Sequence, residues 1–179
     1  MKLLTVFALL CAVMALSTAA DEGSSDGGKR STQPGKVNVE KRTLCYWRRW
    51  VGWTRYGNRY YHYFPYRWTW AQAQRFCESR NANLASVRNL GEYRAIQRVI
   101  YRATHRYGLT WIGGSDAQQE RYWFWIDGTR FRFTYWCRGQ PDNYYGKEHC
   151  LHMNAGGWRC MNDIPCNHRY PFVCVWKRR

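Results

Sequence analysis

Residues 139–150 read GQPDNYYGKEHC, and this short polar run is the most informative part of the chain. It places the amide of Gln140 and the carboxylates of Asp142 and Glu148 around Pro141, and it ends at Cys150. Calcium takes six to eight oxygen ligands, which carboxylate and amide side chains supply. The run is therefore a candidate cation-binding loop.

The N-terminal part of the chain predicts export. Lys2 precedes an apolar run over residues 3–16 and small residues at 17–20, the order of a signal peptide, so we assign residues 1–20 to it. Residues 21–42 contain no aromatic residue and are rich in Gly, Ser and charge, which indicates a disordered leader or propeptide. Residues 43–179 are rich in Trp and Tyr and predict one compact domain. We expect a secreted, extracellular protein.

The cysteine count after the signal peptide is odd. Seven remain: Cys45, Cys77, Cys137, Cys150, Cys160, Cys166 and Cys174. In an exported protein a leftover cysteine indicates a disulfide between chains or a free thiol. Cys45 lies farthest along the chain from the others, so it is the candidate for an interchain disulfide.

The domain is strongly basic. Residues 43–179 contain 22 Lys and Arg against 8 Asp and Glu, a net charge of about +14, and nearly all of the positive charge is arginine. Such a field favours anionic partners, for example bacterial surfaces. The alternative is that the charge only keeps the protein soluble. Nucleic acid is not expected as a partner, because export disfavours it.

Two helices are predicted early in the domain. Thr69 and Gln72 have capping-box spacing at the start of a helix over residues 69–80, and Asn89 and Glu92 repeat that spacing before a second helix. The second helix has an apolar stripe of Tyr93, Ile96, Val99 and Ile100. Its outer side has Arg94, Arg98 and Arg102. Charge at this spacing is typical of a solvated helix face, and the alternative is a docking surface for anions.

Short aromatic strands make up most of the remaining pattern. They are expected in a hairpin at 56–64 (YGNRYYHYF) and at 110–115 (TWIGGS), 122–128 (YWFWIDG), 157–160 (GWRC) and 170–176 (YPFVCVW). Residues 131–150 have no regular period and predict a long functional loop. Helices followed by strands indicate an α+β domain.

Several motifs recur in order along this domain. They are WIGG at 111–114, QPD at 140–142, EHC at 148–150 and ND at 162–163, bracketed by Cys77 and Cys174. With these motifs, the stretch from Cys45 to Trp176 resembles a C-type lectin-like domain. It is similar to galactose-binding lectins of fish skin, mucus and venom and to fish type II antifreeze proteins. The resemblance implies two helices, short antiparallel sheets, a long irregular ligand loop and stabilising disulfides.

The resemblance also implies a disulfide pattern. The pairs are Cys77–Cys174, Cys150–Cys166 and, as in the fish members, Cys137–Cys160. Long-form members pair a cysteine at the position of Cys45 with one in the following hairpin, where this sequence has Tyr60. The departure favours a homodimer linked through Cys45, which would gain avidity on a multivalent glycan surface.

The family pattern assigns five side chains to one calcium ion. They are Gln140, Asp142, Glu148, Asn162 and Asp163, and Pro141 is implied to be cis. Two open coordination positions would accept adjacent sugar hydroxyls, so Gln140, Asp142, Glu148 and Asn162 would also contact the sugar. The order Gln then Asp resembles galactose-type members, whereas Glu then Asn marks mannose-type members. Tyr144 is the candidate ring for stacking on galactose, with Tyr145 in reserve.

Two departures from the family pattern bear on this site. Met161 stands where Trp usually precedes the Asn-Asp pair, and a flexible thioether can fill that space. Arg138, Lys147 and Arg159 are expected to flank the carboxylates and to lower the preference for calcium. An arginine partly replacing the ion is one hypothesis.

The function expected from this resemblance is a calcium-dependent lectin for galactose- or lactose-like glycans that agglutinates microbes in mucosal or innate defence. The alternative is an ice-binding protein on the same fold, although ice adsorption favours a weakly charged face. His149 and His152 beside Cys150 could suggest zinc, but Cys150 has an expected disulfide partner. No Ser, His and Asp arrangement has recognisable nucleophile spacing, so an enzyme is not expected.

Overall fold

An N-terminal hairpin opens residues 52–177, the part of the chain that the computed structural model describes. Strand β1 (Thr54–Tyr56) pairs antiparallel with β2 (Arg59–Trp68) across a turn in which Gly57 has a φ of +61°, a conformation that glycine adopts without strain. The predicted hairpin is confirmed. The proposed signal peptide, leader, domain boundary at residue 43 and Cys45 lie outside the described residues.

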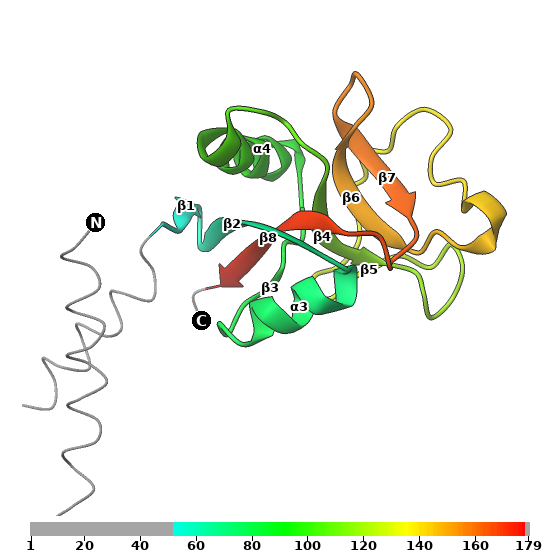
Figure 1. Cartoon of the computed structure of the whole chain (residues 1–179), viewed down its shortest axis with the longest axis horizontal. Coiled ribbons are helices and arrows are strands. Elements are labelled where there is room, and N and C mark those ends of the chain that lie inside the picture. Colours follow the sequence, from blue (N-terminus) through cyan, green and yellow to red (C-terminus); the bar gives the residue numbers. More distant parts are fainter. Residues whose placement is uncertain (1–51, 178–179) are drawn as a thin grey trace, which may run out of the picture. The chain divides into compact units, whose positions relative to one another are not determined.

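The strands join in the order β1-β2-β8-β4-β6-β7, with β3 on β8 and β5 on β4 (Figure 1). The remaining strands are β3 (Asn83–Leu84), β4 (Thr110–Ser115), β5 (Phe124–Trp125), β6 (Cys150–Ala155), β7 (Cys160–Ile164) and β8 (Tyr170–Lys177). The pairings of these strands are antiparallel except that of β4 with β8, where Trp111 lies opposite Phe172. The α+β class with two helices is confirmed.

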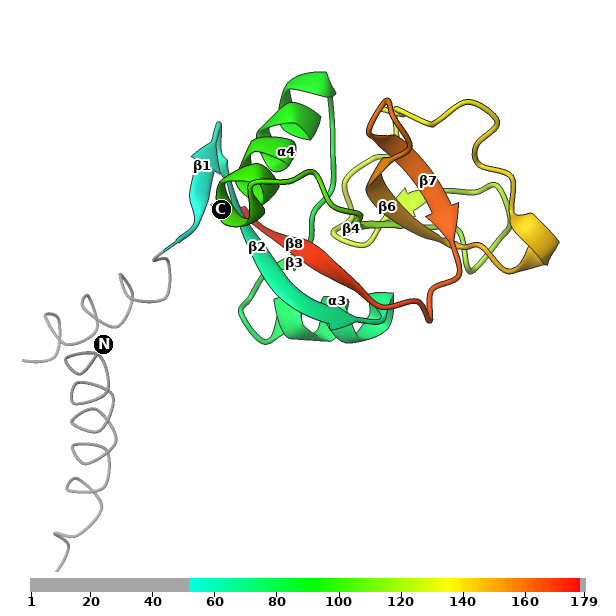
Figure 2. The same cartoon turned by 45° about the horizontal axis from the view of Figure 1, so that its top comes forward.

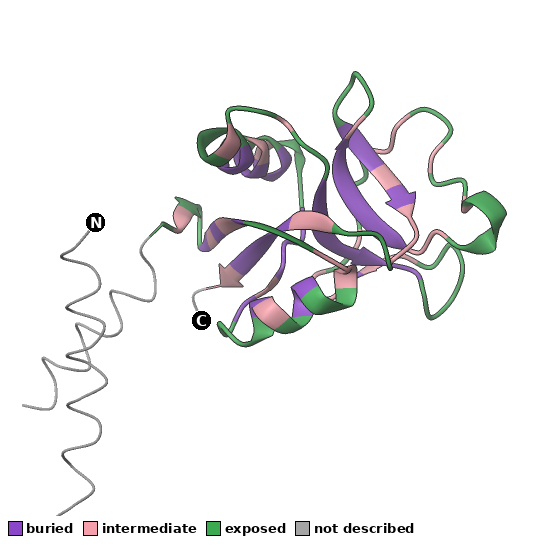
Figure 3. Ribbon diagram, in the orientation of Figure 1, coloured by how far each residue is buried: buried purple, intermediate pink, exposed green. Residues whose placement is uncertain are grey.

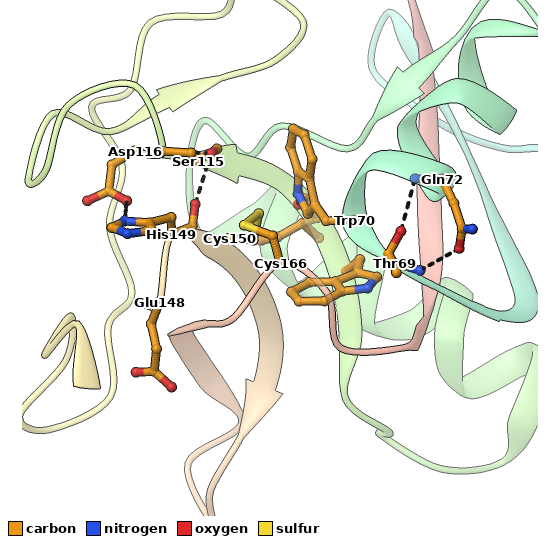
Figure 4. The surroundings of a disulfide bond; sticks show 12 residues. Thr69, Trp70, Gln72, Ser115, Asp116, Glu148, His149, Cys150 and Cys166 are labelled. Atoms are coloured by element: carbon orange, nitrogen blue, oxygen red, sulfur yellow. Dashed lines mark hydrogen bonds and ion pairs between the residues drawn. A yellow bond between two sulfur atoms is a disulfide. The ribbon is translucent and has the colours of Figure 1, made fainter. Parts of the chain in front are cut away.

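Helix α3 (Trp70–Glu78) begins as the sequence predicts. The Thr69 hydroxyl accepts from the Gln72 N–H at 3.4 Å, and the Gln72 side chain accepts from the Thr69 N–H at 3.2 Å, so the capping box is complete (Figure 4). Helix α4 (Leu90–Thr104) buries the predicted apolar stripe. Neither helix has the length and apolar composition needed to cross a bilayer.

The cap of α4 differs from the prediction. The Asn89 side chain accepts from the Glu92 N–H at 2.9 Å, but Glu92 does not return a bond to Asn89. Its carboxylate accepts instead from the N–H and guanidinium of Arg88 and lies 3.7 Å from the guanidinium of Arg59. Glu92 is fully buried, so its charge is satisfied by ion pairs inside the domain rather than by the helix terminus.

The helices lie on either side of the β2–β8 pair, α4 above it and α3 below it in Figures 1 and 2. The inner faces of both helices are buried, and their outer faces are exposed (Figure 3). The α4 stripe packs in a core cluster with residues of strands β4, β6 and β7, among them Ile112, Leu151 and Met161. Met161 is fully buried, in agreement with a thioether filling the place of a larger ring.

Two strand predictions were wrong in extent, and one strand was not predicted. Residues 157–159 form a turn, because Arg159 has a φ of +53° and Gly156 one of +59°, and β7 begins only at Cys160. Only Phe124–Trp125 of the segment 122–128 is a strand, and the ring of Trp123 contacts that of Trp136. Strand β6 was not predicted from the sequence. Its first five residues are buried, so it lacks the alternation of a half-exposed strand.

Within residues 52–177, three disulfides join Cys77 to Cys174, Cys137 to Cys160 and Cys150 to Cys166. They are the pairs implied by the resemblance. Cys150–Cys166 lies where β6 leaves the loop of the sequence motif, and the Cys166 carbonyl accepts from the N–H of Trp70 at the start of α3 (Figure 4). The end of this loop is therefore tied both to the sheet and to α3.

Candidate functional site

The segment 138–149, called here the ligand loop, projects at the end of the domain away from β1 (Figure 1). The Gln140–Pro141 bond is cis, as the resemblance implies. A short 3-10 turn at Tyr144–Gly146 follows, with Asn143 and Tyr145 both at positive φ. The backbone thus folds back on itself, and both acids of the loop face β7.

The loop and β7 bring three carboxylates together. Oxygen atoms of Asp142, Glu148 and Asp163 all lie within 4.8 Å of one another. Asp163 is fully buried in β7, Glu148 is partly buried and Asp142 is exposed. Within residues 52–177, no lysine or arginine forms an ion pair within 4 Å of any of the three. Their negative charge is therefore available to a cation.

The pKa values of two of these acids reflect the crowding. Burial raises the pKa of Glu148, and the nearby carboxylates of Asp163 and Asp142 raise it further. Burial also raises the pKa of Asp163, although backbone N–H donors partly offset the effect. Carboxylates that repel one another in this way are stabilised by a shared cation. Three close hard oxygen donors fit calcium.

Asn143 connects the loop to these acids. Its backbone N–H donates to Asp163 Oδ2 at 2.9 Å, and its side-chain oxygen accepts from the Glu148 N–H at 3.0 Å. The N–H of Asp142 also donates to Asp163, at 3.3 Å. Asn143 was not identified from the sequence. The sequence signal that could have indicated it is its place directly after the QPD motif. In the structure Asn143 has a left-handed conformation, which Asn tolerates.

The two amide residues of the predicted site are engaged locally. Gln140 Oε1 accepts from the Asp142 N–H at 3.2 Å, so its side chain folds along the loop. Asn162 lies in β7 next to Asp163, and its amide group donates to the Asp163 carbonyl at 2.6 Å. The side-chain oxygen of Asn162 forms no hydrogen bond within the described residues. Both amide residues thus bond to residues of the acid group, Gln140 to Asp142 and Asn162 to Asp163.

The candidate stacking rings are at the surface. Tyr144 is 61% exposed and Tyr145 is 79% exposed, and the centroids of their rings lie 4.3 Å apart. The backbone N–H of Tyr144 donates to the Glu148 carboxylate at 3.1 Å. Tyr144, an exposed aromatic residue, is thus bonded through its backbone to one of the three acids.

A second group of possible ligands lies behind the ligand loop. His149 Nδ1 is 3.1 Å from Asp116 Oδ1 and 3.6 Å from Glu120 Oε2. Figure 4 shows His149 turned toward Asp116, while Glu148 points to the other side of the chain. Asn143 donates to Glu120 and so links the two groups. Asp116 and Glu120 were not identified from the sequence. The available signal was that these two residues, among only eight acids in the domain, follow closely after the strand predicted at 110–115.

The two histidines have different surroundings. His152 is buried in β6, and neither ring nitrogen has a hydrogen-bond partner. Burial lowers the pKa of His152 to about 4, and the charge of His168 adds to the effect. In the described part of the chain, no group of three potential metal ligands includes His152. The pair therefore does not form the zinc site that the sequence raised as an alternative.

Of the three basic residues expected around the site, two lie in the ligand loop and one points away from it. Arg138 and Lys147 are exposed in the ligand loop. Arg159 lies in the β6–β7 turn, where its guanidinium stands 3.9 Å from the ring centroid of Tyr107 and its carbonyl accepts from Tyr93. Its charge is thus directed toward α4 rather than into the acid group.

The chain belongs to the C-type lectin domain family, whose sequence pattern matches residues 66–176. Ladderlectin of Oncorhynchus mykiss is 35% identical over 178 residues, 96% of this chain and 92% of that protein. The galactose-specific lectin nattectin of Thalassophryne nattereri is 37% identical over 124 residues, 69% of this chain and 77% of that protein. The structure of herring type II antifreeze protein superimposes with a TM-score of 0.67 at 33% identity, covering 72% of this chain and 98% of that one.

Proposed function

We propose that this chain is a secreted lectin that binds galactose-like sugars through calcium held at the ligand loop. The observation that supports this most directly is the group of three carboxylates within 4.8 Å, without a basic partner among the described residues and beside the exposed ring of Tyr144. The similarity to a galactose-specific fish lectin supports the sugar class.

The residues that would hold the ion are Gln140, Asp142, Glu148, Asn162 and Asp163. When bound, calcium supplies coordination positions for two adjacent sugar hydroxyls. The protein supplies the rest of the recognition. Gln140 and Asn162 offer amide donors, Asp142 and Glu148 offer carboxylate acceptors, and Tyr144 offers a ring for the C–H face of galactose. These polar groups set which diol fits.

Calorimetric titration of the protein with lactose, in calcium and in a chelator, tests the proposal. Binding in calcium and complete loss in chelator are expected. Asp163→Asn should abolish binding, while Asp127→Asn, an acid outside the group of three carboxylates, should not. Lactose binding that persists in chelator would mean that an arginine replaces the ion, and no binding in either condition would refute the sugar assignment.

Ice binding is the second candidate function, because the herring antifreeze protein shares the fold and a third of the sequence. The exposed charges of Lys147 and Arg138 in the ligand loop argue against a flat, weakly charged ice-binding face. Thermal hysteresis, measured beside haemagglutination on the same sample, separates the two candidates. Hysteresis without agglutination would favour the antifreeze function.

Export, a role in agglutinating microbes and a disulfide-linked homodimer complete the proposal. Cys45 is the candidate link, and Tyr60, at the position of its usual partner, lies in β2 with its ring 5.3 Å from Trp176. A dimer with two sugar sites would crosslink cells. A dimer band on a non-reducing gel that disappears in Cys45→Ser is expected, and a monomer band from the unmodified protein would contradict it.

A further inference from the structure

The acidic residues of the domain are all engaged by other groups. They are Glu78, Glu92, Asp116, Glu120, Asp127, Asp142, Glu148 and Asp163. Glu92 and Asp127 form ion pairs with Arg59. Asp116 and Glu120 contact His149, and Glu78 accepts from Gln74. Asp142, Glu148 and Asp163 form the group of carboxylates that we propose binds calcium, called here the calcium group. Of the arginines in residues 52–177, only Arg59 and Arg88 therefore form an ion pair with an acid.

These unneutralised charges form a row on α4. Arg94, Arg98 and Arg102 are exposed and four residues apart, so they cover ~12 Å along the helix axis at 1.5 Å per residue. None of the three forms an ion pair within the described range 52–177. The one acid of α4, Glu92, is fully buried, so the outer face of the helix is uniformly positive.

Aromatic rings extend this face to the β6–β7 turn. Tyr101, 43% exposed on α4, stacks on Tyr107 at 5.0 Å, and Arg159 lies over the other end of this pair. The Arg159 carbonyl also accepts from the side chain of Gln97 on α4. Trp158, next to Arg159, is 85% exposed. We call Arg94, Arg98, Arg102 and Arg159 the α4 basic face.

We infer that the α4 basic face binds a linear sulfated polysaccharide at a site separate from the ligand loop. A guanidinium presents a planar pair of donors that matches the oxygens of a sulfate group. Successive arginines ~6 Å apart require anions at short intervals along a chain. Exposed Trp158 adds a surface on which a sugar ring can stack.

A membrane surface fits this face less well. A helix that binds a bilayer surface inserts its apolar side among the lipids. In α4 that side, including Ile96 and Ile100, is buried in the domain core, so only the charged side is available. Polysaccharides that have a single carboxylate per disaccharide present charges too widely spaced to engage each arginine of the row.

The test measures binding of heparin to the full-length protein in a chelator, which prevents calcium-dependent binding at the ligand loop. The variant R94Q/R98Q/R102Q is compared with R75Q/R130Q/R132Q, which removes the same charge from exposed positions elsewhere. We expect the α4 variant to lose at least tenfold in affinity and the matched variant less than threefold. The slope of log Kd against log salt should fall by ~2–3 in the α4 variant alone, through lost counterion release.

Three further measurements complete the test. Trp158→Ala should weaken heparin binding by ~3-fold or more, as expected for loss of a stacking ring. Desulfated heparin and hyaluronan should bind at least tenfold more weakly than heparin. Lactose binding in calcium should be the same in both triple variants, so failure of the sugar site and failure of this inference are distinguishable.

Equal losses in both triple variants would overturn the inference, because the effect would then be net charge alone. Strong binding of desulfated heparin would overturn the sulfate assignment. Binding to phosphatidylserine vesicles that depends on the three α4 arginines, without heparin binding, would overturn the polysaccharide in favour of a membrane.

Discussion

The backbone N–H of Asn143 lies 2.9 Å from Oδ2 of Asp163, so the buried acid of β7 holds the ligand loop through a main-chain bond. The Asn143 side chain then fixes the Glu148 backbone. One residue thus positions two of the three carboxylates without belonging to the group. Replacing residues that orient metal ligands in this way typically lowers metal affinity by about 10–100-fold.

Replacing Asn143 with glycine tests this positioning role. Glycine keeps the positive φ and the N–H to Asp163 but removes the side-chain bonds to Glu148 and Glu120. Calcium affinity should fall by ~10–100-fold, measured by calorimetric titration with calcium. Tyr145→Gly, also at positive φ but outside these contacts, is the control and should bind calcium normally. Equal affinities for all three proteins would show that Asn143 has no positioning role.

Exchanging amide and acid within the motif should change sugar preference. Q140E/D142N keeps the net charge of the loop but reverses which side of the diol meets a donor. The preference for galactose over mannose should invert by ~10-fold or more, about 1.4 kcal/mol. Competition between the two sugars for immobilised lactose or mannan measures it. If the variant keeps the galactose preference, the order of these two residues does not set specificity.

Arg59 should be important for stability. Its guanidinium is 3% exposed and lies 3.7 Å from Glu92 and 3.9 Å from Asp127, both buried. Arg59→Met would leave these carboxylates short of a partner, and the free energy of unfolding should fall by ~3–5 kcal/mol in a denaturant titration. Arg55→Met, exposed in the same hairpin, should change it by less than ~0.5 kcal/mol. A small loss of stability for Arg59→Met would mean that Arg88 and Lys177 suffice to neutralise Glu92 and Asp127.

His152 should make the fold sensitive to acid. Its pKa is lowered to about 4 in the folded chain, against 6.5 for an ordinary histidine. Between these values the unfolded chain binds a proton that the folded chain does not, so stability is complete above pH 6.5 and is lost as the pH falls toward 4. The loss attributable to His152 is up to ~3 kcal/mol.

His152→Phe keeps a ring beside Trp111 and Tyr170 but cannot titrate. Denaturant titrations at pH 7 and pH 4, in chelator, should show a smaller drop in stability for this variant than for the parent. Parallel drops in the two proteins would assign the acid sensitivity to other groups.

Local signals predicted much of this fold. The Thr69–Gln72 box and the apolar stripe of α4 depend on residues within one or two helical turns, so the sequence identified both. The role of Glu92 depends on Arg59, which is distant in sequence, and capping spacing alone could not reveal that ion pair. Strand β6 was not predicted because burial on both faces removes the alternation of apolar and polar residues that identifies a strand.

In the candidate site, too, residues that belong to local motifs were predicted and residues that depend on distant contacts were not. Asp142, Glu148 and Asp163 were identified through motifs in the right order, and they do converge. Asn143, Asp116 and Glu120 acquire their contacts only when the loop folds back on β4 and β7. Arg159 was misplaced because the turn at Gly156 directs it to Tyr107, which no local pattern of the sequence specifies.

The pairing of β2 with β8 has a practical consequence. Arg59 lies opposite Lys177, so the two ends of the described domain emerge at one edge, and Figure 1 shows the ligand loop at the far side. Immobilising the protein on a bead or sensor chip through either terminus should therefore leave the loop facing outward, and a dense layer of such domains would present many loops to one opposing cell.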